Sequence, residues 1–411
     1  MSPTIFISAG EASGEHYGAL LAASLSRRFA PKGQGAELTL YGMGGDRMAA
    51  AGVERIVRSE DMAVMGITEV VRHLPGIYRE FRKLKKAIRA RRPDVAVLID
   101  FPEIHFRLAE EFHRLGVPVI FFVSPQLWAW KKHRIKLVQK YIRKMLVIFP
   151  FEEAFYRENG VQAEFVGHPL AELPLPSISR QEFAEQNQLD PTAEWIGILP
   201  GSRPREIRDH LADMLEAARQ LSQAYAFQTY EFVVPLAPTL SDSQRAEVLR
   251  LVKQHGQGLT VRLVDDARAA LFHARASVVA SGTATVEAAL IGNPFVVIYR
   301  VSPLTYAVAK RVVKVPHVAM ANLIAGKRLV PELIQEEFTA SNIVREISLL
   351  LPDGVARESM MKELVAIREK LTLAHDPLRK TAPHAIDRVA AITLEELALA
   401  SAAQTELAAQ P

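Results

Sequence analysis

The chain has 411 residues, of which 49% are hydrophobic and 23% charged, a balance typical of a globular protein and not of a disordered one. It contains no cysteine, which excludes disulfide scaffolds, thiolate metal sites and cysteine nucleophiles and is typical of a reducing compartment. The formal net charge is only +4, so any strongly basic surface must be local.

The sequence indicates neither a membrane-spanning helix nor an N-terminal leader. No stretch of 18 apolar residues occurs, so we expect no helix that crosses a bilayer. The first ten residues carry no basic leader, so we expect no signal peptide. These features predict a protein that is soluble or at most peripheral to a membrane.

Short β-rich runs alternate with helical patterns along the chain. Strands that are apolar throughout are buried on both faces, and their alternation with helices predicts parallel α/β sheets. The clearest strands are expected at residues 4–8, 95–100, 119–124, 145–149, 195–199, 231–236, 277–280 and 295–300.

The series of strands then restarts, which indicates a second domain. The length of the chain also favours two domains. A polar stretch with early prolines, at 174–192, predicts a linker before a new strand-turn-helix pattern at 196–203. We therefore predict an α/β protein with two doubly wound, Rossmann-like domains that face a central cleft. The domains are expected at 1–170 and 190–345, followed by helices over 346–411.

The first turn that could carry chemistry, at residues 8–15, follows the first strand and opens a helix. Its two glycines allow a ligand to approach the backbone closely, and free N–H groups at a helix start favour an anion or sugar hydroxyls. An ordinary tight turn capped by Ser13 is an equally good interpretation. The spacing is not G-x-G-x-x-G, so a dinucleotide fingerprint is not supported. The candidate residues are Gly10, Glu11, Ser13 and Gly14, and a similar but unspecific turn at 42–45 follows another expected strand.

The second turn, at residues 199–206, indicates phosphate binding more strongly. Gly201 and Ser202 lie where a helix starts, and Arg203 could bring a planar cationic fork to a diphosphate. Capping of the helix by Ser202 is the alternative. A Walker A loop is excluded, because the sequence around Lys327 has Ala321 where the upstream glycine would be required.

The third turn follows the strand expected at 277–280. Ser281, Gly282 and Thr283 would present N–H and hydroxyl donors at a helix start, and Glu287 could accept hydrogen bonds from ribose hydroxyls. A structural role for that glutamate near the helix dipole is the alternative. Together with the turn at Arg203, this pattern predicts a site for a nucleoside diphosphate.

A carboxylate ends one of the expected central strands. Asp100 would point into a cleft, the place for a general base that acts on an acceptor hydroxyl, although it could simply cap the next turn. Glu103 is a second candidate for that base. No Asp-x-Asp, His-x-x-x-His or cysteine motif indicates a metal, and a transferase that neutralises its leaving diphosphate with arginine and helix dipoles needs none. We expect neither metal nor cofactor.

Basic residues gather in two stretches next to apolar ones. Residues 78–92 carry eight Lys or Arg against one Glu and follow the apolar run 62–71, and a Trp-Ala-Trp run at 128–130 is followed by basic residues up to 144. Such segments suit an anionic membrane surface or a phosphorylated lipid. The rival interpretations are a nucleic-acid patch, which lacks any recognition motif here, and a solvated helix face. The candidate membrane residues are Met62, Val64, Met65, Arg79, Arg82, Lys83, Lys86, Trp128 and Trp130.

A series of short motifs, in order from residue 10 to about 340, resembles the lipid-A-disaccharide synthase family. They are Gly-Glu-Ala-Ser-Gly at 10–14, Met-Ala-Val-Met-Gly-Ile-Thr-Glu at 62–69, Ile-Asp-Phe-Pro at 99–102, Val-Ser-Pro-Gln-Leu-Trp-Ala-Trp at 123–130, Phe-Val-Gly-His at 165–168, Leu-Pro-Gly-Ser-Arg at 199–203, Ala-Ser-Gly-Thr at 280–283, Ala-Asn-Leu-Ile-Ala-Gly at 321–326 and Val-Pro-Glu-Leu-Ile-Gln-Glu at 330–336. The Ser-Pro-x-x-Trp-Ala-Trp run is the most specific of these motifs.

The resemblance implies a fold, a reaction and a place in the cell. The fold is the two-domain GT-B glycosyltransferase fold, without metal, with a C-terminal segment that packs back across domains, commonly in an intertwined homodimer. The reaction transfers 2,3-diacylglucosamine from its UDP donor to the 6-hydroxyl of 2,3-diacylglucosamine 1-phosphate, with inversion, in lipid A biosynthesis of Gram-negative bacteria. It takes place at the cytoplasmic face of the inner membrane.

The same resemblance implies roles for individual residues. Asp100 matches the proposed catalytic carboxylate, Arg203 the diphosphate arginine and Glu287 the ribose glutamate, while Asn322 and Gln335 match polar residues near the donor. The first three agree with the roles that the residues themselves suggest. The chain departs from the family pattern at Glu15, Phe101, Glu103, His105 and Gln126.

Two other functions remain open at this point. A sugar-nucleotide epimerase, or a glycosyltransferase with a soluble acceptor, would share the fold and the nucleotide site. A non-catalytic protein that binds membranes or nucleic acid would share only the basic segments.

Overall fold

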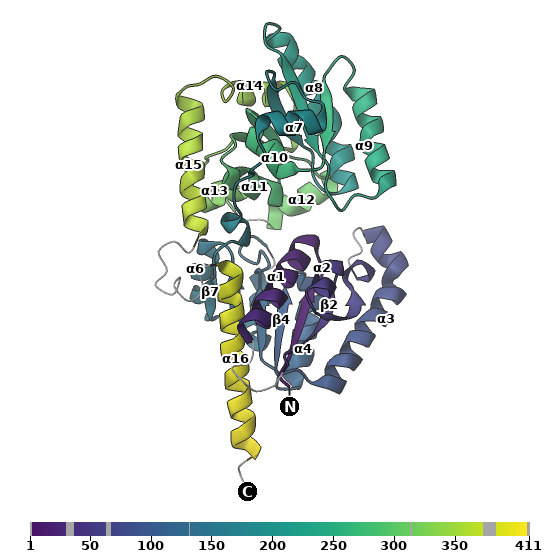
Figure 1. Cartoon of the computed structure of the whole chain (residues 1–411), viewed down its shortest axis with the longest axis vertical. Helices are drawn as coiled ribbons and strands as arrows, with labels where there is room; N and C mark the ends of the chain where they lie inside the picture. The colour runs from purple at the N-terminus through teal and green to yellow at the C-terminus, as the bar shows by residue number, and fades with distance from the viewer. Residues whose placement is uncertain are drawn as a thin grey trace. The chain divides into compact units, whose positions relative to one another are not determined.

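The computed structural model describes residues 2–29, 37–62, 67–130, 132–312, 315–372 and 384–408. The chain divides into two compact units. The first comprises Met1–Glu172 together with Leu371–Pro411, and the second comprises Leu173–Lys370. In the ribbon drawing the first unit contains the purple and blue segments and the yellow C-terminal helix (Figure 1).

The first unit contains a seven-stranded parallel sheet with the order β3-β2-β1-β4-β5-β6-β7. Its strands are β1 (Thr4–Ala9), β2 (Thr39–Gly44), β3 (Glu54–Arg58), β4 (Val95–Ile99), β5 (Val119–Phe122), β6 (Lys144–Val147) and β7 (Ala163–Phe165). Its helices are α1 (Ala12–Phe29), α2 (Asp46–Ala50), α3 (Ile67–Arg91), α4 (Pro102–Arg114), α5 (Ile135–Tyr141), α6 (Pro150–Glu158) and α16 (Ala385–Ala408), with 3-10 turns η1 (Ser59–Asp61), η2 (Lys132–Arg134) and η3 (Pro169–Glu172).

Two hydrophobic cores cover the two faces of this sheet. Successive side chains of a strand point to opposite faces, so Ile5 and Ile7 of β1 enter one core and Phe6 enters the other. The first core includes residues of α1 and α16, and the second includes residues of α3 and α4. Burial on both faces explains why the inner strands are apolar throughout.

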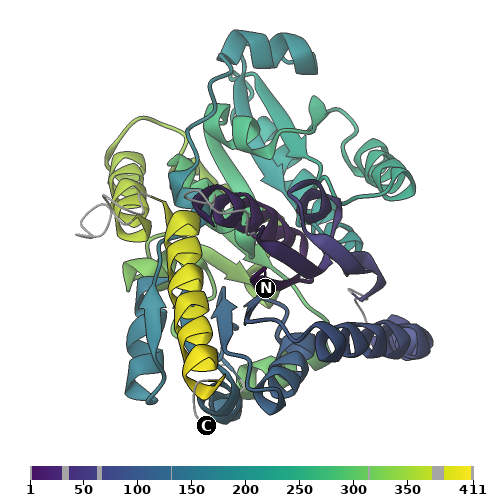
Figure 2. The ribbon, with the colours of Figure 1, turned by 60° about the horizontal axis from the view of Figure 1, so that its bottom comes forward.

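The C-terminal helix α16 belongs to the first unit and completes its first core. Val389 and Ile392 are buried against that core. Asp387 accepts a hydrogen bond from the Ser24 hydroxyl of α1 at 2.7 Å, and Glu396 pairs with Lys144 at 3.1 Å. Both ribbon views place the yellow helix α16 along this unit, beside α1 (Figures 1 and 2).

The second unit contains a six-stranded parallel sheet with the order β10-β9-β8-β11-β12-β13. Its strands are β8 (Glu194–Leu199), β9 (Tyr230–Pro235), β10 (Val261–Val264), β11 (Ala276–Ala280), β12 (Phe295–Tyr299) and β13 (Glu332–Ile334). Its helices are α7 (Arg180–Asn187), α8 (Pro204–Ala224), α9 (Asp242–His255), α10 (Ala267–His273), α11 (Thr283–Ile291), α12 (Pro303–Val312), α13 (Met320–Ala325), α14 (Ala340–Ser348) and α15 (Val355–Leu371), with a 3-10 turn η4 (Gln335–Glu337).

The prediction of two doubly wound parallel sheets is confirmed, and the eight expected strands correspond to β1, β4, β5, β6, β8, β9, β11 and β12. The strands that the sequence did not predict, β3, β7, β10 and β13, are the edges of the two sheets. Each edge strand is partly exposed and therefore lacks a continuous apolar run. The turn expected at 42–45 differs as well, because Gly42–Gly44 lie inside β2.

The segment expected as a linker is partly folded into the second unit. Residues Arg180–Asn187 form helix α7, which Ser179 caps by accepting a hydrogen bond from Glu182 N–H. Phe183 of this helix packs in a core cluster with Trp195 of β8. A single buried aromatic in an otherwise polar helix gives a weak amphipathic pattern, which explains why the sequence read as a linker.

Candidate active site

The order of the strands identifies the edge of each sheet where a ligand is expected. In doubly wound sheets, ligands bind beyond the carboxyl ends of the strands, at the point where the strand order reverses. In the first unit that point lies between β1 and β4, and in the second it lies between β8 and β11. The predicted turns at 8–15, at Asp100, at 199–206 and at 281–283 follow these four strands, so the topology places them in two pairs, one in each unit.

Asp100 follows β4 in a backbone conformation that is unusual for a residue with a side chain. Asp100 and Phe101 have φ values of +52° and +51°, each of which costs about 1–3 kcal/mol in a non-glycine residue. The N–H of Asp100 donates to the carbonyl of Phe122 in β5 at 2.9 Å. Such strain persists where the surrounding structure holds it in place, and it concentrates at functional sites.

A buried histidine holds the carbonyl of Asp100. His105 Nδ1 lies 2.5 Å from Asp100 O, and His105 Nε2 lies 2.8 Å from the hydroxyl of Ser8 in β1. A carbonyl oxygen can only accept, so Nδ1 carries the proton and Nε2 accepts from the serine hydroxyl. Burial lowers the pKa of His105 to about 4, so the ring is neutral at physiological pH.

The carboxyl group of Asp100 titrates near neutrality. Burial raises its pKa to about 7, and the neighbouring carboxylate of Glu11 adds to this increase. Part of the Asp100 surface remains accessible. A partly accessible carboxyl with a pKa near the working pH suits a general base.

The turn after β1 lies against the turn that carries Asp100. A Cβ atom on Gly10 would come within 2.2 Å of the Phe101 ring, so only glycine leaves room for that ring. Gly14 is buried, and Glu11 and Ser13 are partly exposed. Glu15, one of the departures from the family pattern, accepts a hydrogen bond from Met48 N–H at 3.0 Å and so fixes helix α2.

Two further departures from the family pattern, Glu103 and Gln126, have partners of their own. Glu103 forms a two-pronged ion pair with Arg134, at 2.7 and 3.0 Å, and is therefore engaged in the conformation described. Gln126 is exposed, and its carbonyl accepts hydrogen bonds from Ala129 N–H and Trp130 N–H.

In the second unit, the turn after β8 is open to solvent. Gly201 has a φ of +122°, and Ser202 and Arg203 are exposed. The carboxylate of Glu206 accepts from Ser202 N–H at 3.2 Å and from Arg203 N–H at 3.3 Å, and it pairs with the Arg203 guanidinium at 3.3 Å. An acidic side chain of the chain itself therefore uses the donors that the sequence assigned to a diphosphate.

A second buried histidine holds this turn. His210 of α8 lies with Nδ1 2.7 Å from Pro200 O, while its Nε2 accepts from Arg300 N–H at 3.1 Å. It thus ties the ends of β8 and β12 together. The sequence predicted neither of these contacts, although His105 is one of the departures from the family pattern. The available signal was a histidine among buried apolar positions of an amphipathic helix, at 105, 108, 109 and 112 in α4.

The turn after β11 begins helix α11. Ser281 is partly exposed and its N–H donates to Ile298 O at 3.0 Å, whereas Gly282 and Thr283 are exposed. Glu287 lies in the second turn of α11, where burial raises the pKa of its carboxyl and the charge of Arg268 opposes that increase. The topology therefore places Gly201–Arg203 and Ser281–Thr283 at one edge of the sheet, next to each other in strand order.

Asn322 and Gln335 are both buried and bind backbone groups of the second unit. The amide of Asn322 accepts from Leu329 N–H and Val330 N–H and donates to Val330 O and Glu332. Gln335 accepts from Val301 N–H and donates to Val301 O, and its own backbone has a φ of +55°. Both side chains hold loops in place, so any effect on a ligand would act through those loops.

The candidate membrane residues do not all lie at the surface. Arg79, Arg82, Lys83 and Lys86 are exposed on α3, whereas Met62 is only 3% exposed and packs in the second core. Trp128 is partly buried, and its indole N–H donates to Glu152 at 3.0 Å. Trp130 is 43% exposed. Val64 and Met65 lie outside the described residues.

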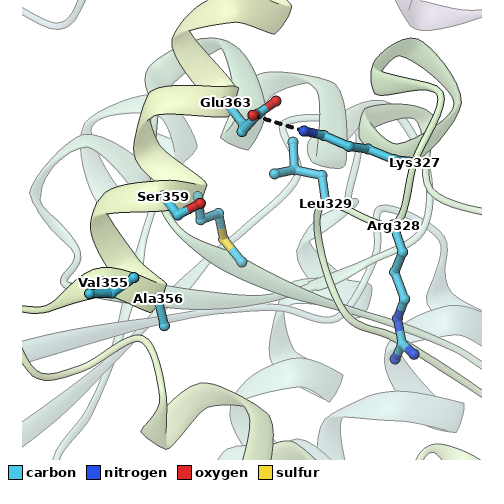
Figure 3. Close-up of a pocket in the computed structure, with 8 residues that line it drawn as sticks. Lys327, Arg328, Leu329, Val355, Ala356, Ser359 and Glu363 are labelled. Atoms are coloured by element: carbon cyan, nitrogen blue, oxygen red, sulfur yellow. Dashed lines mark ion pairs between the residues drawn. The ribbon is translucent and has the colours of Figure 1, made fainter.

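A pocket of about 370 Å³ lies elsewhere in the second unit and contains none of the predicted site residues. It lies between α15 and the loop at 327–329, and the ion pair between Lys327 and Glu363, at 2.8 Å, spans it (Figure 3).

Within the described ranges, no group of three His, Asp or Glu side chains is placed to hold a metal ion. Over the same residues, no helix is both long and apolar enough to cross a bilayer.

Solved structures of a glycosyltransferase and of a sugar-nucleotide epimerase share this fold. A calicheamicin glycosyltransferase superposes with a TM-score of 0.56 at 18% identity, over 97% of this chain and 99% of that one. A UDP-GlcNAc 2-epimerase from Neisseria meningitidis, solved with UDP-GlcNAc bound, gives 0.56 at 13% identity over the same shares. These likenesses show the GT-B fold, the class in which two doubly wound α/β domains form one chain.

The family follows from the sequence comparisons. The family model described as lipid-A-disaccharide synthetase matches residues 5–386. A lipid-A-disaccharide synthase from Acidobacterium capsulatum is 59% identical over 90% of this chain and 92% of its own length, and one from Koribacter versatilis is 51% identical over 89% and 93%. The chain belongs to the lipid-A-disaccharide synthase family, glycosyltransferases of lipid A biosynthesis, which confirms the resemblance found in its motifs.

Proposed function

We propose that the protein transfers 2,3-diacylglucosamine from UDP to the 6-hydroxyl of 2,3-diacylglucosamine 1-phosphate, with inversion, to give a β(1→6) disaccharide 1-phosphate and UDP. Membership of the family supports this reaction. The observation that carries the chemistry is the carboxyl group of Asp100, which has a pKa raised to about 7 and lies in a strained turn at the switch point of the first sheet.

In this proposal Asp100 is the general base. The oxygen of the acceptor 6-hydroxyl forms a bond to the anomeric carbon of the donor, the bond from that carbon to the phosphate oxygen breaks, and UDP leaves with the electron pair. The hydroxyl proton passes to the Asp100 carboxylate. A base with a pKa near 7 can take this proton and then return it to water at neutral pH. The turn formed by Gly10, Glu11, Ser13 and Gly14 would line the acceptor side.

The donor would bind at the switch point of the second sheet. The Arg203 guanidinium, with N–H groups of Gly201 to Arg203 and of Gly282 and Thr283 and the Ser281 hydroxyl, would bind the diphosphate, and Glu287 would bind the ribose hydroxyls. Exposure of Arg203 supports this assignment, because its side chain can reach a ligand. Asn322 and Gln335 would keep the surrounding loops in position.

The exposed basic face of α3 would hold the enzyme at an anionic membrane, at the cytoplasmic face of the inner membrane, where the acylated substrates are found. Arg82, Lys83 and Lys86 share this face with the exposed ring of Tyr78. Basic residues near an anionic surface contribute about 1 kcal/mol each, and salt screens them.

The resemblance also leads us to propose a homodimer. Met361 and Val365, exposed one turn apart on α15, support a surface that a partner covers.

One assay tests the reaction directly. The purified protein is incubated with both acylated sugars, and UDP and the disaccharide are quantified by mass spectrometry. We expect the two products in equal amounts, and no UDP release when the acceptor is left out. Conversion of the donor sugar without acceptor would contradict the proposal and favour an epimerase. Binding to anionic vesicles that salt abolishes would support the membrane role, and equal binding to neutral vesicles would contradict it.

A further inference from the structure

Two buried polar side chains next to Asp100 have no part in the reaction proposed above. Ser8 lies in β1 and His105 in α4, 97 positions apart, and neither has any solvent exposure. Their hydrogen bonds form a chain from the Ser8 hydroxyl, through the imidazole ring, to the carbonyl oxygen of Asp100. Burial of an unpaired polar group costs free energy, and the hydrogen bonds between Ser8, His105 and Asp100 avoid that cost.

The chain of hydrogen bonds ends on the strained residue. The left-handed conformation of Asp100 is unfavourable and needs contacts on each side to maintain it. Its N–H is fixed by Phe122 O at 2.9 Å, and its carbonyl is fixed by His105 at 2.5 Å. When both peptide groups that flank a residue are held, the direction of its Cα–Cβ bond is set as well.

We propose that His105, itself oriented by Ser8, is a positioning residue that sets the direction of the Asp100 carboxyl group. This inference rests on the proposed role of Asp100 as the base. The imidazole ring can link the Ser8 hydroxyl in β1 to the Asp100 carbonyl after β4, because it donates at Nδ1 and accepts at Nε2. Its neutral state is stable, since burial lowers the pKa of His105 to about 4.

A packing role is the alternative, and the surroundings of the ring allow the two to be separated. His105 contacts the rings of Phe101 and Phe121 edge-on, with centroids 5.8 and 6.0 Å apart. His105→Phe keeps a ring in this place but removes both hydrogen bonds. His105→Asn keeps a donor and an acceptor but removes the ring. If hydrogen bonding matters, the asparagine variant is the more active; if packing matters, the phenylalanine variant is.

The charges around Asp100 give the direction of the expected pH effect. Glu11, in the turn just before α1, is the charged group that acts on Asp100, while Glu103 on α4 is paired with Arg134. A carboxyl released from its fixed direction gains contact with water, so its pKa moves down toward the usual value. The acid limb of the rate profile should therefore move to lower pH in His105→Phe.

The experiment measures kcat, both KM values, the pH profile of kcat and UDP binding for His105→Phe, His105→Asn, Ser8→Ala, Asp100→Asn and the double variant His105→Phe/Asp100→Asn. We expect His105→Phe to lower kcat by about tenfold or more with unchanged UDP binding, and His105→Asn to recover most of that loss. Ser8→Ala should have a smaller effect in the same direction. In the Asp100→Asn background, His105→Phe should cause no further loss, because its effect passes through Asp100.

The outcomes separate failure of this inference from failure of the proposed function. An active Asp100→Asn enzyme would overturn the role of Asp100 itself. An inactive Asp100→Asn enzyme, together with a His105→Phe enzyme of normal kcat and pH profile, would overturn the positioning role alone. If His105→Phe does not fold, Ser8→Ala decides: an unchanged kcat and acid limb in that variant would also overturn the inference.

Discussion

The turn after β4 and the turn after β8 are built in the same way but are suited to different tasks. Each joins a central strand to a helix that starts with a proline, Pro102 in α4 and Pro204 in α8. In each, a buried histidine of that helix lies within hydrogen-bond distance of a carbonyl in the turn, His105 for Asp100 and His210 for Pro200. Proline at this position is favourable because its missing N–H would have no partner there in any case.

The two turns differ in strain and in exposure. After β4, two residues with side chains adopt positive φ and burial raises the pKa of the Asp100 carboxyl, whereas after β8 a glycine takes the positive φ and the Arg203 side chain is 52% exposed. Proton transfer benefits from a group whose pKa is shifted by removal from water. Anion binding needs accessible N–H groups and a cation that a ligand can reach. In the proposed mechanism, one backbone pattern would therefore serve both needs, depending on which residues occupy the turn.

The largest effect is expected at the first turn. Asp100→Asn keeps the size of the side chain but removes the proposed base, so kcat should fall about 10²-fold or more, while UDP binding measured by calorimetry stays normal. Glu103→Gln is the matched control, since Glu103 is paired with Arg134 and should lose far less. Near-normal turnover in Asp100→Asn would mean that the two turns do not differ in the way described.

The pH dependence of turnover tests the same turn without a mutation. In the proposed mechanism only the carboxylate form of Asp100 can accept the proton, and burial raises the pKa of this group to about 7. Protonation below that value removes the base, so kcat should fall about tenfold for each unit of pH below about 7 and level off above it. The measurement is the rate at saturating substrates in buffers of constant ionic strength. A rate that stays flat down to pH 5 would contradict the shifted pKa.

At the second turn, removal of the cation should act on binding and not on proton transfer. Hydrogen bonds to charged groups contribute about 1.5–3 kcal/mol, so Arg203→Ala should weaken UDP binding about 10- to 100-fold. The acid limb of the pH profile should stay where it is. Arg205→Ala, next along α8 and paired with Asp209, is the control and should bind UDP normally. Equal affinity in both variants would remove Arg203 from the donor site.

The smallest effect is expected from Glu206, whose carboxylate occupies the donors of this turn. Glu206→Gln keeps the capping hydrogen bonds of α8, since glutamine also fits the capping box, and removes only the charge. A partly exposed charge pair contributes up to about 1 kcal/mol, so UDP should bind up to about fivefold more tightly. The melting temperature should not change. Weaker UDP binding would show that the carboxylate supports the site instead of competing with the ligand.

The sequence predicted the inner strands because they are buried on both faces, and it predicted the turns because glycine, serine and charged residues follow those strands. It did not predict the edge strands, which lack a full apolar run. It predicted roles for Asp100 and Arg203, and the structure places each of them in the turn that follows a central strand. It could not identify the pairing of Ser8 with His105, because no local pattern reports a contact between residues 97 positions apart. The sequence also could not predict that Glu206 accepts hydrogen bonds from Ser202 N–H and Arg203 N–H, because these bonds depend on the conformation of the Glu206 side chain.

The position of α16 has a consequence for how the chain folds as it is synthesised. The second unit is one continuous segment, Leu173–Lys370, whereas the first needs residues from both sides of it. The ribosome releases the chain from its N-terminus, and domains generally fold as they emerge. The second unit can therefore fold before the first unit is complete. The apolar surface that Val389 and Ile392 cover stays exposed until α16 has been synthesised. Because exposed apolar surface makes folding intermediates prone to aggregate, we expect the nascent chain to be most prone to aggregation in this interval.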